Sequence, residues 1–173
     1  MNRLLLRIER AARLIVSWGV AGALHPDLSA GALLRPAKVM SAESGELFES
    51  AALDSTLDRL VSVRKPVDSR QERLALAQRT GAVAVDMEGA TIAAICRREG
   101  IPFQCVRAIS DGIDHRLPAW VTNLMTADGQ LAPWRTLAGL LRDPMSLPEL
   151  LRAGIGFRRA LKTLERYATN FEP

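Results

Sequence analysis

The sequence constrains its fold most between residues 82 and 111, where two short apolar runs flank a segment of helical length. The runs 82–86 and 102–109 are rich in Val, Ala, Ile and Phe, and the segment 89–98 between them is followed by Gly100, a residue type that often ends helices. Two strands joined by a helix predict a parallel pair with a right-handed crossover. We therefore expect an α/β fold, a three-layer sandwich around a central, mostly parallel mixed sheet.

The rest of the chain alternates in the same way between short apolar runs and helical patterns. The expected helices are 2–12, 47–60 and a segment that opens at 68–71 and runs through Gln78 to a stop near Gly81. The expected strands are 13–18, part of 31–40 in which Pro36 indicates an edge or irregular piece, and 61–67, with a small-residue turn at 19–22 and a loop at 41–46. No repeat or low-complexity linker interrupts the pattern, which predicts a single domain over 1–173 with a C-terminal helical extension at about 134–168.

Composition narrows the class of protein. The 173 residues are 48% hydrophobic, enough for one buried core, and no segment reaches the run of about 18 uncharged apolar residues that a membrane span needs. The leucines of the N-terminus are interrupted by Arg3, Arg7 and Glu9, so we expect no signal peptide and a cytoplasmic location. Cys96 and Cys105 lie in apolar patterns without a CxxC or a nearby histidine, which predicts reduced, buried thiols and no metal site.

The net charge of +4 is compatible with an anionic partner. Aromatic residues make up only 5% of the chain, and no zinc-finger or RNP-type motif occurs. We therefore expect no nucleic-acid partner.

Carboxylates follow two of the expected strands. Glu88 and Asp111 each come just after an apolar run, and the small-residue turn 19–22 follows Trp18 in the same way. In open α/β sheets, ligands bind beyond the carboxyl ends of the strands, so the three loops are expected to share one cleft. The alternative is structural, because acidic residues at strand-to-helix turns often only cap the helix.

The amino-acid sequence of this region as a whole resembles that of a known superfamily. The segment AVDMEGATIAAICRREGIPFQCVRAISD is similar to the purine nucleoside phosphorylase and methylthioadenosine/adenosylhomocysteine nucleosidase superfamily, in which a Met-Glu pair opens a helix and the next strand ends in Arg-x-Ile-Ser-Asp. Upstream, SWGVAGALHPDLSAGALLRP resembles its Gly-x-Ala-Gly turn and Gly-Asp-Leu strand, with Ala32 in place of the Asp. Downstream, Pro118, DGQLAPWRTLAGLLRDPMSLPELLRAG and the Arg-rich terminal helix resemble the hopanoid-associated phosphorylase subfamily.

The resemblance implies a chemistry for the carboxylates. Cleavage of a ribosyl C–N bond makes the sugar cationic and the base electron-rich, so an acid near the base and a carboxylate near the sugar both lower the barrier. Asp111 would act on N7 of the purine, and Glu88 would accept hydrogen bonds from the ribose hydroxyls. Met87 would pack on the sugar or fill the core, and Arg107 would lie near the nucleophile or form a structural ion pair.

Further substrate contacts are implied for Ser110, Trp18, Gly19 and Val20. Val20 occupies the place where many relatives carry a hydroxyl that contacts phosphate or attacking water, so one ligand of the nucleophile is absent. The loop 63–67 lacks the aromatic residue that stacks on adenine in the nucleosidases, which leaves the identity of the base open. Relatives begin with a glycine-bearing strand, and we expect this N-terminal strand element to be missing here.

The function implied is release of adenine from an adenosylated hopanoid, with phosphate as co-substrate or water as acceptor and with no other cofactor. A methylthioadenosine/adenosylhomocysteine-type nucleosidase and a noncatalytic scaffold of the same fold remain alternatives. An uncovered sheet edge invites pairing with another chain, so a homo-oligomer is expected.

The C-terminal segment 147–168 is a basic amphipathic pattern. Its apolar residues at helical spacing are Leu147, Leu150, Leu151, Ile155, Phe157, Leu161 and Leu164, and its basic residues are Arg152, Arg158, Arg159, Lys162 and Arg166. Such a helix can cover a core or lie on an anionic membrane surface, where it would place the protein at the periphery of a membrane.

Overall fold

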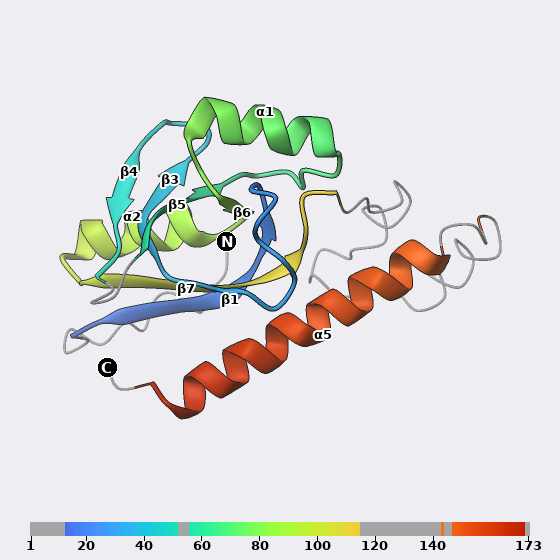
Figure 1. The fold of residues 1–173 in the computed structure, drawn as a ribbon. Helices are drawn as coiled ribbons and strands as arrows, with labels where there is room; N and C mark the ends of the chain where they lie inside the picture. Colours follow the sequence, from blue (N-terminus) through green and yellow to red (C-terminus); the bar gives the residue numbers. More distant parts are fainter. Residues whose placement is uncertain (1–12, 52–55, 115–142, 144–146, 172–173) are drawn as a thin grey trace.

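The computed structural model describes residues 13–51, 56–114, 143 and 147–171 (Figure 1). Its strands are β1 (Ile15–Ala23), β2 (Leu33–Leu34), β3 (Pro36–Ser41), β4 (Leu47–Glu49), β5 (Thr56–Ser62), β6 (Ala84–Asp86) and β7 (Phe103–Asp111). Its helices are α1 (Arg70–Thr80), α2 (Gly89–Glu99) and α5 (Leu147–Thr169). The helix expected at 2–12 lies outside the described residues, as does nearly all of the expected extension before Leu147.

The strands form one seven-stranded mixed sheet in the order β2-β7-β1-β6-β5-β3-β4. Helices α2 and α5 lie on either side of β1 and β7 (Figure 1). Cys96 of α2 shares a core cluster with Ile109 of β7, whereas Gly156 of α5 abuts the neighbouring Ser110. Because successive strand residues face opposite sides of a sheet, the two helices cover opposite faces. The expected α/β sandwich around a mixed sheet is confirmed.

The turn expected at 19–22 is wrong, because these residues form the second half of β1. β1 pairs in parallel with β7 along its length, with one register shift between Ala21 and Gly22. A Cβ added to Gly19 would lie 3.6 Å from the guanidinium carbon of Arg107. The glycine pattern therefore does not indicate a turn. It indicates a strand that a side chain approaches closely.

The helix expected at 47–60 is also wrong, since β4 and β5 occupy most of this span. Phe48 of β4 and Leu60 of β5 are buried, and their strands pair with opposite sides of β3. Helix propensities differ by only tenths of a kcal/mol for most residues, so sheet pairing and burial decide the outcome. The strand expected at 61–67 begins earlier and ends at Ser62.

The span 31–40 contains two strands, β2 and the start of β3. Pro36 is the first residue of β3, and the register with β5 shifts between Pro36 and Lys38. The irregularity predicted from the proline is therefore confirmed. The loop expected at 41–46 connects β3 to β4.

Both expected capped helices begin and end close to their sequence signals. Ser69 caps α1, because its Oγ accepts a hydrogen bond from the Glu72 N–H at 3.2 Å and the Glu72 carboxylate accepts one from the Ser69 N–H at 3.3 Å. Gly81 and Gly100 end α1 and α2 with positive φ angles of 63° and 68°. Caps involve only near neighbours, so the sequence predicts them well.

β6 and β7 form where the sequence predicts strands, but they do not pair with each other. β1 lies between them, parallel to β7 and antiparallel to β6. β6 and β7 therefore run antiparallel to each other, and the predicted parallel crossover pair is wrong. The helical connection specifies that two strands share a sheet, and it does not exclude a strand from an earlier part of the chain between them.

The two cysteines are free and buried, as predicted. Burial raises the pKa of the Cys105 thiol to about 12 and also raises the pKa of Cys96. The reactive thiolate is therefore disfavoured at both positions.

Helix α5 packs on the sheet through its small residues. Gly156 and Ala160 are its buried positions, and Thr163 donates a hydrogen bond from Oγ1 to the carbonyl of Gly31 at 2.8 Å. Its large apolar side chains are exposed instead: Leu147, Leu151, Ile155, Phe157 and Leu161. The expectation that the helix covers the core is therefore wrong for these five side chains. Small residues contact the sheet instead, because they let the helix approach it closely. Within the described ranges, no helix is both long enough and apolar enough to cross a membrane.

Gly156→Ala should lower the free energy of unfolding by roughly 1–3 kcal/mol. The added Cβ would lie 2.2 Å from the carbonyl oxygen of Ser110, and this overlap outweighs the gain of about 1 kcal/mol that Ala brings to a helix. Gly154→Ala is the matched control, since no atom lies within 4 Å of its added Cβ, and it should stabilise the protein slightly. Urea denaturation measures both changes. Equal shifts for the two variants would contradict the close packing of α5.

Candidate functional site

A cavity of about 240 Å³ lies where β1, β6 and β7 end beside the loop that precedes α1. Five of the residues predicted from the sequence line it: Val20, Met87, Glu88, Ser110 and Asp111. The expectation that the strand ends share one cleft is thus met for these five. The cavity lies at the strand ends of an α/β sheet, which is where such folds bind ligands.

Asp111 is held in a fixed position at the end of β7. The hydroxyl of Ser110 donates a hydrogen bond to its Oδ1 at 2.5 Å, and Nη2 of Arg73 lies 2.5 Å from its Oδ2. The Asp111 side chain keeps 18% of its surface exposed. A Cβ on Gly22 would lie 3.2 Å from the same Oδ2, so the glycine lets β1 approach the carboxylate closely. The carboxylate is therefore oriented, with its Oδ2 buried beside Arg73, and the side chain lines the cavity.

Arg73 organises this end of the site, and the sequence analysis missed it. Its guanidinium donates hydrogen bonds to the carbonyls of Val67 at 3.1 Å, Ala23 at 3.3 Å and Gly112 at 3.0 Å. It therefore ties the ends of β1 and β7 to the loop before α1. A sequence signal existed, because Arg73 falls on the same helical face as the buried Leu76 of α1, where a cation needs a partner.

Glu88 and Met87 also line the cavity, and both are exposed. Glu88 occupies the N-cap position of α2, yet its side chain makes no capping hydrogen bond. Nor does its carboxylate form an ion pair or hydrogen bond with any residue in the described part of the chain. The capping alternative is therefore excluded for Glu88, and its oxygens are free to accept hydrogen bonds from a ligand.

Asp86 performs the structural role at this turn. Its Oδ2 accepts hydrogen bonds from the Gly89 N–H at 3.0 Å and from Nε and Nη2 of Arg107 at 2.9 and 2.7 Å. Its Oδ1 accepts one from the Ser62 hydroxyl at 2.5 Å. The side chains of Asp86 and Arg107 are each only 2% exposed. This buried ion pair, in which two guanidinium nitrogens share one carboxylate oxygen, joins β6 to β7.

The pairing with Asp86 decides between the two interpretations of Arg107. The guanidinium also donates to the carbonyl of Ser17 at 2.6 Å and to its hydroxyl at 3.0 Å, so its donors are occupied inside the fold. Arg107 does not line the cavity. The geometry therefore supports a structural ion pair for Arg107, and it does not support a position near a nucleophile.

Trp18 and Gly19 also lie away from the cavity. The Trp18 ring packs against Tyr167 of α5 and against Phe171, with ring centroids 5.3 and 5.2 Å apart. Gly19 faces the Arg107 side chain. Both residues belong to β1, which extends through 19–22. Because successive strand residues face opposite sides of the sheet, Trp18 faces α5 and Gly19 faces the buried interior.

Asp68 is a further carboxylate at the cavity, beside Asp86, Glu88 and Asp111, and no role for it was predicted from the sequence. Burial raises its pKa, and the charges of Glu72 and Asp111 raise it further, while Arg73 acts in the opposite direction. The residue precedes the α1 cap, so its sequence context resembles an ordinary helix start. Only the tertiary structure places it beside Asp111.

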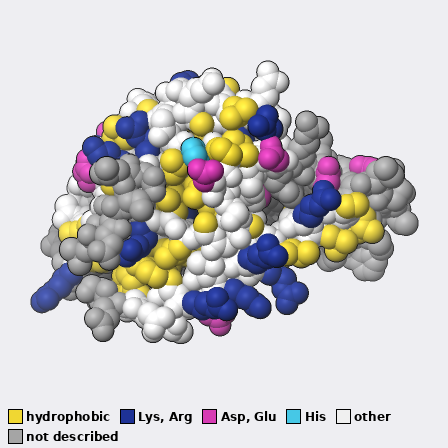
Figure 2. All heavy atoms as spheres, viewed as in Figure 1, with side chains coloured by type: hydrophobic (Ala, Val, Ile, Leu, Met, Phe, Trp, Pro, Cys, Tyr) yellow, Lys and Arg dark blue, Asp and Glu magenta, His cyan; other side chains and the backbone are white. Residues whose placement is uncertain are grey.

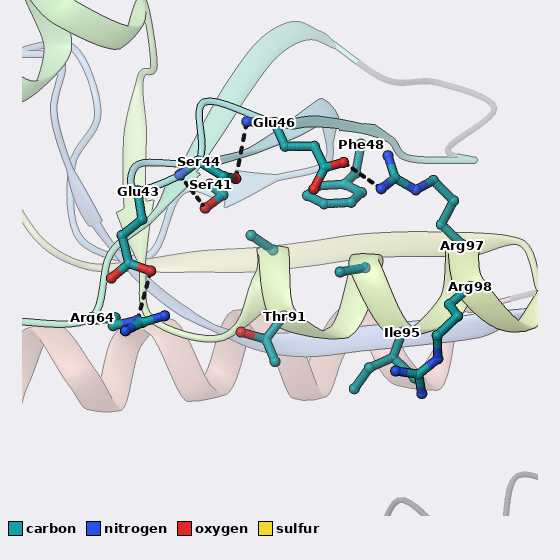
Figure 3. Close-up of a pocket in the computed structure, with 12 residues that line it drawn as sticks. Ser41, Glu43, Ser44, Glu46, Phe48, Arg64, Thr91, Ile95, Arg97 and Arg98 are labelled. Atoms are coloured by element: carbon teal, nitrogen blue, oxygen red, sulfur yellow. Dashed lines mark hydrogen bonds and ion pairs between the residues drawn. The ribbon is translucent and has the colours of Figure 1, made fainter.

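A larger hollow of about 750 Å³ lies between the β3–β4 hairpin and α2 (Figure 3). Its charged side chains are paired, since Arg64 pairs with Glu43 at 2.7 Å, Arg97 pairs with Glu46 and Arg98 pairs with the adjacent Glu99. None of the residues predicted to contact a substrate lines it. We therefore assign the candidate site to the smaller cavity.

The fold, with the cavity at its strand ends, gives this α/β protein the architecture of the nucleoside phosphorylases and nucleosidases. Residues 59–129, which include Glu88 and Asp111, match the model of the Phosphorylase superfamily. No curated protein sequence matches the chain.

Solved structures share this fold. A 5′-methylthioadenosine/S-adenosylhomocysteine nucleosidase from Helicobacter pylori is 21% identical with a TM-score of 0.57, covering 92% of this chain and 69% of its own. A methylthioadenosine nucleosidase described as putative, from Weissella paramesenteroides, is 23% identical over 58% of each chain, with a TM-score of 0.53. Futalosine hydrolase from H. pylori is 24% identical over 59% of this chain and 56% of its own, with a TM-score of 0.53. This chain thus spans somewhat more than half of the latter two structures.

Proposed function

We propose that this protein is a cytoplasmic enzyme that cleaves the N-ribosyl bond of a purine nucleoside. The observation that carries the proposal is the pair of carboxylates on one cavity, the oriented Asp111 and Glu88, which has no partner among the described residues. Since Asp86 already caps α2 and balances Arg107, the protein's stability does not require Glu88 to be an acid. A free carboxylate at such a position is well suited to ligand binding.

The proposed reaction divides the charges between the two carboxylates. Water or phosphate attacks C1′ of the ribose, the C1′–N9 bond breaks, and its electron pair leaves with the purine; an attacking water releases its surplus proton to the solvent, from which Asp111 is reprotonated. Asp111 delivers a proton to N7, so the base departs neutral, while Glu88 accepts hydrogen bonds from the ribose hydroxyls and stabilises the cationic sugar. Ser110 and Arg73 position Asp111 for this transfer.

The proposed substrate is an adenosine derivative, with an adenosylated hopanoid as the specific candidate. The 5′-methylthioadenosine/S-adenosylhomocysteine nucleosidase among the structures of the same fold supports the adenosyl part, and the similarity of residues 118–154 to the hopanoid-associated subfamily supports the lipid part. A methylthioadenosine/adenosylhomocysteine-type substrate is the alternative. Among the described lining residues, Arg73 is the only cation and is engaged by Asp111, which favours water over phosphate as the acceptor.

The direct test measures adenine release from adenosylhopane, methylthioadenosine and adenosylhomocysteine, each with and without phosphate. Release that does not depend on phosphate is the expected result. If a folded sample releases no base from any of the three, the noncatalytic scaffold replaces the enzyme proposal.

Glu88→Gln should weaken nucleoside binding and slow turnover while leaving the affinity for free adenine nearly unchanged. The amide keeps the size of the side chain and removes the charge that stabilises the sugar in the transition state. Steady-state kinetics and adenine titration measure the two effects. Glu99→Gln, at the far end of the same helix, is the control and should behave like the wild type. Equal loss of adenine and nucleoside binding would contradict the sugar-side role.

A further inference from the structure

Helix α5 carries a row of large apolar side chains on its outer surface. Leu147, Leu151 and Ile155 follow one another at intervals of four residues and are 43%, 58% and 52% exposed. Phe157 and Leu161 extend this surface and are 46% and 47% exposed. Because α5 uses Gly156 and Ala160 to contact the sheet, the apolar row is not needed to attach the helix to the protein.

Basic side chains continue the row toward the C-terminal end of the helix. Arg159, Lys162 and Arg166 follow Ile155 at helical spacing, and together with the loop 29–32 they line a hollow of about 460 Å³. None of the three forms an ion pair within the described part of the chain. Figure 2 shows hydrophobic side chains over the N-terminal half of α5 and Lys and Arg side chains over its C-terminal half.

We propose that this surface of α5 docks on an anionic phospholipid membrane. The apolar row would enter the boundary between headgroups and acyl chains, and Arg159, Lys162 and Arg166 would contact lipid phosphates. α5 contains five basic and two acidic residues, so its charge complements an anionic surface. The same charge disfavours a second copy as the occupant, because each of two paired helices would carry a net positive charge. This inference is independent of the reaction at the cavity.

The test is sedimentation of the full chain with vesicles of phosphatidylcholine alone or mixed with phosphatidylglycerol. We expect binding to the mixed vesicles that weakens as salt is raised. Replacing Leu151 and Ile155 together with Glu should lower the affinity at least about tenfold, because it places charges in the apolar row. Leu47→Glu is the matched control, since Leu47 is 41% exposed on β4, and it should bind like the wild type.

Three results would overturn the proposal. The first is no binding to anionic vesicles by a folded wild type, and the second is equal binding by the Leu151→Glu, Ile155→Glu variant. The third is a fall in solution mass for that variant, measured by light scattering, without any vesicle binding by the wild type, which would identify a second copy as the occupant. Circular dichroism verifies that the variant is folded, as expected for two exposed positions.

Discussion

Asp86→Ala is expected to lower the free energy of unfolding by roughly 3–5 kcal/mol. The substitution leaves the Arg107 guanidinium buried without its counter-charge and leaves the Ser62 hydroxyl and the Gly89 N–H without their acceptor. Urea denaturation followed by circular dichroism measures the loss. If the alanine variant does not fold, Asp86→Asn retains an acceptor and the approximate shape, and a smaller loss is then measurable.

Glu88→Ala is the control for Asp86→Ala, two residues further along the same turn. Its carboxylate has no partner in the described structure, so the expected change is within about 0.5 kcal/mol. Similar losses for the two variants would mean that the division into a structural Asp86 and a ligand-binding Glu88 is incorrect. The double variant Asp86→Leu, Arg107→Met should be more stable than Asp86→Ala, because it removes both buried charges.

Asp111→Asn is expected to reduce the rate of adenine release by roughly 10² or more. Asparagine keeps the shape and one hydrogen bond to the base, but it cannot deliver the proton that neutralises the departing purine. Adenine binding, measured by calorimetry, should change little. A fully active variant would exclude Asp111 as the acid.

Stability must be measured together with activity for this variant, since Asp111 also pairs with the buried Arg73. The amide oxygen of asparagine can still accept a hydrogen bond from the guanidinium, so the variant should fold with a modestly lower melting temperature. Asp114→Asn is the matched control, because Asp114 is exposed and pairs with Arg70 at 2.6 Å outside the cavity. It should leave the rate unchanged.

The sequence predicted best those features that depend on near neighbours. The capping box at Ser69, the glycine stops after α1 and α2 and the strands on either side of α2 all follow from residues a few positions apart. The Met-Glu and Ser-Asp motifs likewise predicted four site residues that line one cavity: Met87, Glu88, Ser110 and Asp111. Short motifs can do this because strand ends gather at predictable edges of an α/β sheet.

Pairing between distant strands decided those features of the fold that the sequence alone could not predict. β1 extends through 19–22 because β7 supplies hydrogen-bond partners along its whole length, and β4 and β5 form because each pairs with one side of β3. Those partners come from distant parts of the chain, so no local pattern encodes them.

The division of labour among the charged residues was also decided in three dimensions. By its motif alone, Arg107 could bind a nucleophile or balance a buried acid, and Asp86 and Glu88 are equally acidic residues of one turn. The sequence by itself determined which residue types stand at the strand ends and where the capped helices begin and end. Only the tertiary structure decided that Arg107 pairs with Asp86, that Arg73 orients Asp111 and that Glu88 has no partner in the described part of the chain, because burial and partners from other elements set the role of a charge.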